Sequence, residues 1–217
     1  MAQPETNRLR LPMFPLGSVV LPGGPLPLHI FEPRYRQLVA DLLASDQATM
    51  EFGTIMIERG REVGGGEQRA EVGTLVSIVD VQVSDDGRYG VMAVGTQRVR
   101  VVEWLHDDPY PLAVVERWPD QPPAASVPAV SAATIEGLRG QVERCYELAR
   151  NLGEEVPDQL PLSSVEPEEA LYELASWSPT TVADRYAVLA APSLSERAAV
   201  LAAALDDAEA VLKFRSS

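Results

Sequence analysis

Apolar and polar positions alternate through the first half of the chain, which is the pattern of strands that bury one face. The clearest stretch spans residues 72–94, where the valines of 79–83 alternate with polar residues ahead of an Asp-Asp-Gly turn at 85–87. The turn glycine can adopt the positive φ that a tight hairpin needs. The pattern therefore predicts a β-hairpin, followed by two more strands at 97–105 and 112–118.

Helical spacing replaces this alternation in two parts of the chain. After Pro33, apolar residues recur at three- and four-residue intervals, which predicts one short helix inside the β-rich half. Beyond residue 130 the same spacing predicts four helices, which we place near 135–152, at 167–177, at 179–190 and from Ser193 onward. Ser178 and Ser193 stand where they can cap the last two helices.

A segment dense in proline, alanine and serine separates the two halves. Residues 119–130 can neither pair as a central strand nor continue a helix, so we expect a linker there. The expected fold class is α+β, with an antiparallel barrel or sandwich at residues 9–118 and a helical bundle at residues 131–215. Residues 62–67 contain three consecutive glycines and are expected to form a mobile loop between strands.

Charge and composition narrow the classes of partner. The formal net charge of −14 repels phosphate polyanions, so nucleic acid is a disfavoured partner. The single cysteine, Cys145, lies on an apolar helical stripe, and we expect a small buried hydrophobic residue in a reducing cytoplasm. No apolar run has the length of a membrane span or the form of a signal peptide, so we expect neither membrane insertion nor export.

One long string carries a family resemblance. Residues 11–35 read LPMFPLGSVVLPGGPLPLHIFEPRY, which closely resembles the opening of the N-terminal domain of Lon proteases. The resemblance continues in order through residues 52–55, 72–75, 86–89 and 94–99, and it is weaker in the helical half. It implies a PUA-like antiparallel β-barrel followed by helices, and a role in binding unfolded or tagged polypeptides or in docking to partner proteins.

The residue inventory argues against the ATPase and the protease that accompany this domain in Lon proteases. A Walker motif needs a lysine after glycine, and the Lon nucleophile is a serine paired with a lysine, but the only lysine is Lys213 near the C-terminal end. The chain has two histidines, His29 and His106, too few for a histidine-rich metal centre. We therefore expect a stand-alone module that is not an enzyme and needs no metal or cofactor.

The first candidate site follows from the resemblance and from its place at a turn into a helix, since loops on a rigid barrel often carry recognition surfaces. The candidate polypeptide-binding residues are His29, Phe31, Glu32, Arg34 and Tyr35. The alternative is that Glu32 and Arg34 form ion pairs that hold the loop in place, with Arg98 or Arg100 as further partners.

Arg98 and Arg100 are also the second candidate, a basic patch. PUA-like folds are used elsewhere for RNA, so an RNA-binding protein is the alternative function, and it requires both side chains to face outward. The leading hypothesis is a non-catalytic adaptor or sensor for exposed or unfolded protein segments, whose partners are proteins, among them a separate protease. Apolar contacts and hydrogen bonds at a sheet edge would bind the segment, and the acidic surface would favour basic sequences.

Overall fold

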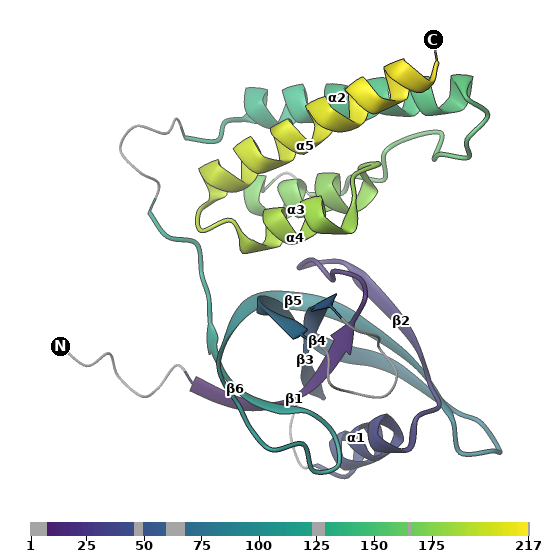
Figure 1. Ribbon diagram of the computed structural model, residues 1–217, viewed down its shortest axis with the longest axis vertical. Helices are drawn as coiled ribbons and strands as arrows, with labels where there is room; N and C mark the ends of the chain where they lie inside the picture. Colours follow the sequence, from purple (N-terminus) through teal and green to yellow (C-terminus); the bar gives the residue numbers. More distant parts are fainter. Residues whose placement is uncertain (1–7, 46–49, 60–67, 123–128, 165, 217) are drawn as a thin grey trace. The chain divides into compact units, whose positions relative to one another are not determined.

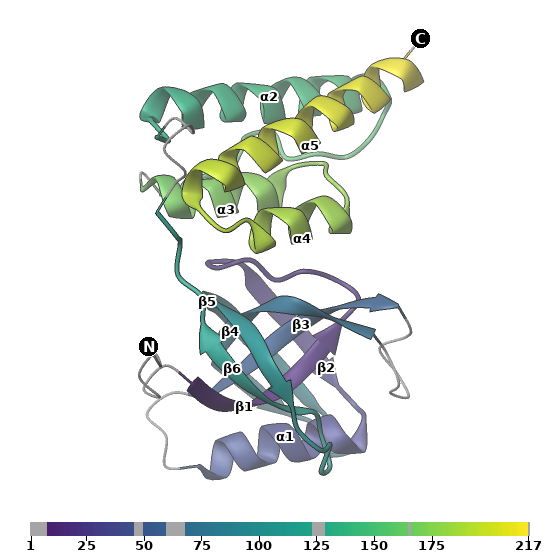
Figure 2. The same ribbon diagram turned by 60° about the vertical axis from the view of Figure 1, so that its left-hand side comes forward.

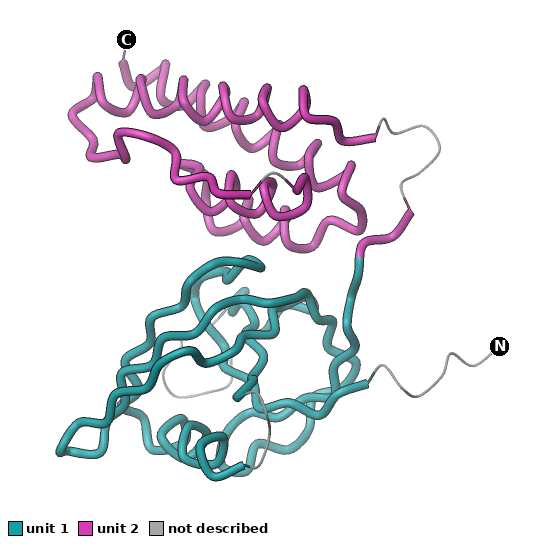
Figure 3. The backbone as a smooth tube through the Cα atoms, turned by 180° about the vertical axis from the view of Figure 1, so that it is seen from behind, with its two compact units in different colours: residues 1–119 teal, residues 120–217 magenta. Residues whose placement is uncertain are grey.

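The computed structural model describes residues 8–45, 50–59, 68–122, 129–164 and 166–216. These residues divide into two compact units, Met1–Pro119 and Asp120–Ser217, called here the β unit and the helical unit (Figure 3). The loop expected at 62–67 lies outside the described residues, and so does the 123–128 part of the expected linker.

The β unit contains a six-stranded mixed sheet and one helix in its described part (Figure 1). The elements are β1 (Arg8–Leu16), β2 (Pro25–Ile30), α1 (Pro33–Ala44), β3 (Glu51–Arg59), β4 (Gln68–Val83), β5 (Tyr89–Trp104) and β6 (Leu112–Arg117). The strand order is β2-β5-β4-β3-β1-β6, and β6 pairs with β5 as well as with β1. Strands β1, β3, β4, β5 and β6 therefore form a closed cycle of pairings, and β2 joins this cycle only through β5.

The expectation of antiparallel strands throughout is wrong at one pairing. β1 and β3 run parallel, with Met13 opposite Gly53. The connection between β1 and β3 contains β2 and α1. It returns the chain to the end of the sheet where β1 began, so β3 runs in the same direction as β1. The other pairings are antiparallel, and Gly87, with a φ of 74°, forms the hairpin turn between β4 and β5 as predicted.

β4 and β5 are single strands of 16 residues each. The break expected near residue 95 is therefore wrong: β5 passes through Gly95, where an added Cβ would lie 2.4 Å from the carbonyl oxygen of Leu21. The register of β4 against β5 shifts between Ile78 and Asp80, so Val79 is an extra residue of the kind found in a β-bulge. The bulge interrupts the alternation expected for residues 79–83.

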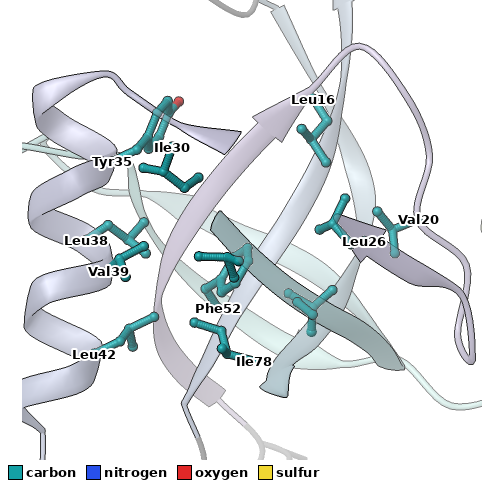
Figure 4. Packing of buried hydrophobic residues seen from close by; sticks show 13 residues of the cluster. Leu16, Val20, Leu26, Ile30, Tyr35, Leu38, Val39, Leu42, Phe52 and Ile78 are labelled. Atoms are coloured by element: carbon teal, nitrogen blue, oxygen red, sulfur yellow. The ribbon is translucent and has the colours of Figure 1, made fainter. Parts of the chain in front are cut away.

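Helix α1 covers part of the core of the β unit (Figure 4). Pro33 suits its first turn, and the buried face carries Tyr35, Leu38, Val39 and Leu42. These side chains belong to one cluster with sheet residues that include Phe52. Burying each such side chain stabilises the fold by roughly 1.5–3 kcal/mol. This holds α1 against the sheet, and with it the segment that leads into the helix.

Tyr110, in the connection between β5 and β6, also attaches to α1. Its hydroxyl donates to Oδ2 of Asp41 at 2.8 Å. Burial, together with the hydrogen bond to that carboxylate and its charge, raises the pKa of Tyr110 to about 12. The connection is thus held on the helix at neutral pH.

The helical unit contains four helices in its described residues: α2 (Ala132–Asn151), α3 (Pro167–Trp177), α4 (Val182–Ala190) and α5 (Leu194–Arg215). Figures 1 and 2 show α2 and α5 side by side, with α3 and α4 forming a second layer of the same unit. Cys145 is free and buried, as predicted, and the core around it includes Val142, Leu201 and Leu205. No described helix is long and apolar enough to cross a membrane.

Capping explains where the two C-terminal helices begin. Ser193 caps α5 as predicted, because its side chain accepts the backbone N–H of Glu196. The cap predicted at Ser178 for α4 is wrong: α4 starts three residues later, where Thr181 and Asp184 form a capping box. Ser178 instead ends α3 and donates its hydroxyl to the carbonyl oxygen of Leu174. The carboxylate of Asp184 accepts the backbone N–H of Thr181 in return, and this reciprocal bond makes Thr181 the better cap.

Candidate polypeptide-binding surface

The first two candidate residues are accessible. His29 is exposed in β2, and Phe31, with 52% of its surface exposed, follows directly after the strand. Their ring centroids lie 6.3 Å apart. Residues two apart in extended chain point to the same side, so the two rings form one exposed surface at the end of β2.

The other three candidate residues stiffen the turn into α1. Nε of Arg34 lies 3.1 Å from Oε2 of Glu32, and the Arg34 guanidinium lies 4.5 Å above the ring of Tyr35. Tyr35 is only 3% exposed, and its ring stacks on Phe14 with centroids 4.1 Å apart. This placement fits the structural alternative for Glu32, Arg34 and Tyr35 and leaves His29 and Phe31 as the accessible part of the segment.

Arg98 and Arg100 do not form an outward-facing pair. Arg98 is buried, with its guanidinium 4.5 Å from the ring of Trp118. Arg100 is exposed, but its Nε and Nη2 lie 3.1 and 2.8 Å from Oε1 of Glu116. Glu32 thus pairs with Arg34, and Arg100 pairs with Glu116. The further partnership of Glu32 and Arg34 with Arg98 or Arg100 stays a prediction.

A larger exposed apolar surface was not anticipated from the sequence. It lies on a three-stranded arm made of β2, residues 89–94 of β5 and residues 78–83 of β4, beyond the part of β4 that pairs with β3. The turn that ends this arm projects at the lower right of Figure 1. Its exposed apolar side chains are Val79 at 61%, Val83 at 66% and Met92 at 38%, and Phe31, at 52%, follows the end of β2. The register places Met92 on the same face as His29 and places Val83 on the opposite face.

The register shows how these side chains are grouped. Met92 lies between Pro27 of β2 and Asp80 of β4, next to the bulged Val79. Gly90 lies between His29 and Gln82, and a Cβ added there would lie 3.8 Å from the Cβ of Gln82. The bulge explains why sequence alternation missed this surface, since it turns Val79 out of the core.

The charges on the arm are mainly acidic. Asp80, Asp85 and Asp86 are exposed, and Arg88 pairs with Asp86 at 3.1 Å. A second cation, Arg36 of α1, lies at the turn, with its Nη2 2.3 Å from the place where a Cβ on Gly87 would be. The described residues hold no group of three or more His, Cys, Asp or Glu side chains able to ligate a metal ion. The arrangement therefore suits contact with apolar and basic groups.

Comparison with known proteins identifies relatives of the chain. The chain is 29% identical over 193 residues to Lon protease 2 of Myxococcus xanthus, covering 88% of this chain and 21% of that protein. It is 31% identical over 124 residues to a LON peptidase N-terminal domain and RING finger protein of Schizosaccharomyces pombe, covering 52% of this chain and 25% of that protein. The chain thus spans only about a fifth to a quarter of these relatives.

Solved structures share the fold. The Lon N-terminal domain protein from Xanthomonas campestris superposes with a TM-score of 0.63 at 27% identity, covering 90% of this chain and 98% of that one. The N-terminal domain of the Mycobacterium avium complex Lon protease superposes with a TM-score of 0.58 at 17% identity. The sequence model of the ATP-dependent protease La (LON) substrate-binding domain matches residues 10–207. The chain therefore belongs to the LON substrate-binding domain family, as the string at residues 11–35 predicted.

Proposed function

We propose that the chain is a cytoplasmic, non-catalytic module that binds exposed or unfolded polypeptide segments and acts as an adaptor or sensor. The observation that carries the proposal is the exposed apolar surface formed by Phe31 and by Met92 of the arm, which lies on the same face as His29. Exposed apolar side chains grouped on one surface are a common mark of protein interaction sites. Membership in a family described as substrate-binding supports the same role.

Two features support the finer parts of the proposal. The closed cycle of strand pairings fits a PUA-like barrel, on which the arm is an extension. The RNA-binding alternative is weakened, because it needs Arg98 and Arg100 to face outward, whereas Arg98 is buried and Arg100 is paired with Glu116. A separate protease remains a proposed partner, to which the module would deliver the bound segment.

The expected binding chemistry is apolar contact with an acidic surround. Covering a side chain such as Phe31 or Met92 with an apolar group contributes roughly 1 kcal/mol or somewhat more. Asp80 and Asp85 would attract lysine or arginine in the bound segment, and this part of the affinity falls as salt increases.

The test is a fluorescence anisotropy titration of the protein against a labelled unfolded polypeptide and, in parallel, a labelled single-stranded RNA. We expect saturable polypeptide binding without RNA binding. Phe31→Ser and Met92→Ser should each weaken polypeptide binding several-fold while costing only about 1 kcal/mol of stability, because Phe31 is 52% and Met92 38% exposed. Phe214→Ser is the matched control: that phenylalanine is 83% exposed on α5 and should bind as the unchanged protein does. RNA binding alone, or equal losses in all three variants, would contradict the proposal.

A further inference from the structure

The three-stranded arm has two outer edges, one on β2 and one on β4. In an antiparallel pair, alternate residues turn their N–H and C=O groups toward the partner strand and the others turn them away. Both edges can therefore be assigned residue by residue from the hydrogen bonds at the ends of the arm.

The β2 edge is obstructed. Gly95 exchanges hydrogen bonds with Gly23 and Gly24. Counting back from Gly95, every second residue of β5, namely Ala93, Val91 and Tyr89, therefore turns its N–H and C=O groups toward β2. The register then makes Leu26, Leu28 and Ile30 their partners. The residues whose main-chain groups face outward are Pro25, Pro27 and His29. Proline has no N–H to donate, so only His29 offers a donor along this edge.

Among the described residues the β4 edge has no strand partner along 79–83. The N–H of Ser84 donates to the carbonyl oxygen of Arg88, and the register continues this alternation with Gln82 opposite Gly90 and Asp80 opposite Met92. Val81 and Val83 therefore turn their N–H and C=O groups away from β5. On that side the last main-chain hydrogen bond runs from the N–H of Ile78 to the carbonyl oxygen of Met50, just before β3, and in the described chain no strand pairs with residues 79–83.

We propose that residues 79–83 of β4 are a strand-addition site, at which an extended segment of a partner polypeptide hydrogen-bonds to the N–H and C=O groups of Val81 and Val83. This inference rests on the proposed function and names its binding mode. The edge spans about 17 Å at about 3.4 Å per residue, enough for a segment of about five residues. Main-chain pairing tolerates many sequences, as binding of unfolded segments requires, and the exposed side chains of Val79 and Val83 add apolar contact.

Charge selects the occupant. Asp80 and Asp85 flank this edge, and the whole chain carries a net charge of −14. An edge-to-edge pair of two copies would bring these carboxylates together, which is unfavourable. A partner strand that alternates apolar residues with lysine or arginine places positive charge beside them instead. The expected occupant is therefore a basic, apolar extended segment of another polypeptide.

The decisive variant is Val83→Pro, compared with Val83→Thr. The proline removes an N–H that faces away from β5, so the ladder inside the arm stays intact, as it does at Pro25 and Pro27 on the other edge. Threonine keeps the N–H and the branched shape but reduces the apolar surface. With a labelled peptide of about ten residues that alternates valine with lysine, we expect Val83→Pro to weaken binding about tenfold and Val83→Thr about twofold.

A second measurement follows the main chain directly. Residue-resolved amide exchange should show the N–H groups of Val81 and Val83 slowed by the valine–lysine peptide, with those of Asp80 and Gln82 unchanged because they already face β5. A peptide that is N-methylated at every second residue should lose binding when the methyl groups replace the N–H groups that would pair with β4. A valine–glutamate peptide should bind more weakly than the valine–lysine peptide.

The outcomes separate the inference from the function on which it rests. Peptide binding that is equal in the proline and threonine variants, or that leaves the two valine amides unprotected, overturns strand addition while the polypeptide-binding function stands. Absence of binding by every peptide and by unfolded polypeptide overturns both. Concentration-dependent dimerisation that Val83→Pro abolishes would show that a second copy occupies the edge, which also overturns the proposal.

Discussion

Phe31 and Tyr35 lie four residues apart and have opposite environments. Phe31 follows the last residue of β2 and is half exposed, whereas Tyr35 lies on the inner face of α1 against Phe14. The sequence could predict that these residues belong to one segment, because the string at 11–35 is characteristic. It could not predict which aromatic ring is accessible, since that depends on the angle at which α1 leaves β2 and on a stacking partner many residues earlier in the chain.

This difference gives a prediction at the scale of single residues. Tyr35→Ala should lower the free energy of unfolding of the β unit by about 3–5 kcal/mol, because it leaves a cavity beside Phe14 and removes the ring beneath Arg34. Phe31→Ala should cost less than about 1 kcal/mol. Urea unfolding measures both, and Tyr35→Phe is the control that retains the stacking. A small loss in Tyr35→Ala would mean that the ring is not a core residue in solution.

The start of a helix and the place of a hairpin turn were predictable where residues close together in the sequence determine them. Capping fixed the start of α5 at Ser193, and the turn glycine fixed the β4–β5 hairpin. The unbroken path of β5 through Gly95 and the parallel pairing of β1 with β3 were not predictable, because both arise when distant strands close the cycle. Glycine alone reads as a strand break, yet here it permits the close approach of another segment.

Two glycines test this distinction at the level of elements. An added Cβ at Gly73 in β4 would lie 2.1 Å from the backbone oxygen of Thr54, whereas one at Gly137 in α2 would meet nothing within 4 Å. Gly73→Ala should therefore destabilise the protein by about 1–3 kcal/mol or more. Gly137→Ala should stabilise α2 by up to about 1 kcal/mol. Thermal unfolding followed by circular dichroism should show shifts of opposite sign, and a tolerated alanine at 73 would contradict the close contact.

At the scale of the whole molecule, the chain passes from the β unit to the helical unit at Pro119 and Asp120. The N–H of Trp118 donates to the carbonyl oxygen of Arg98 in the β unit. Asp120 pairs with Arg197, 77 residues further along the helical unit. Composition marks proline and alanine as linker residues but cannot reveal that an aspartate next to them has a buried partner. Residues next to Pro119 on either side are thus each held by a different unit.

The Asp120–Arg197 pair should therefore govern the stability of the helical unit. The Arg197 side chain is 0% exposed and lies 4.3 Å from the ring of Tyr172, so Asp120→Ala would leave a buried positive charge without its carboxylate. We expect the free energy of unfolding to fall by about 3–5 kcal/mol, with most of it recovered in the double variant Asp120→Ala with Arg197→Met, which removes the charge as well.

Glu116→Ala, which breaks the exposed pair with Arg100, is the matched control and should cost less than about 1 kcal/mol. Urea unfolding followed by far-ultraviolet circular dichroism reports mainly on the helices. Equal, small losses in Asp120→Ala and Glu116→Ala would show that the first residues after Pro119 are not anchored, and the whole 119–130 segment would then act as the linker that its composition predicts.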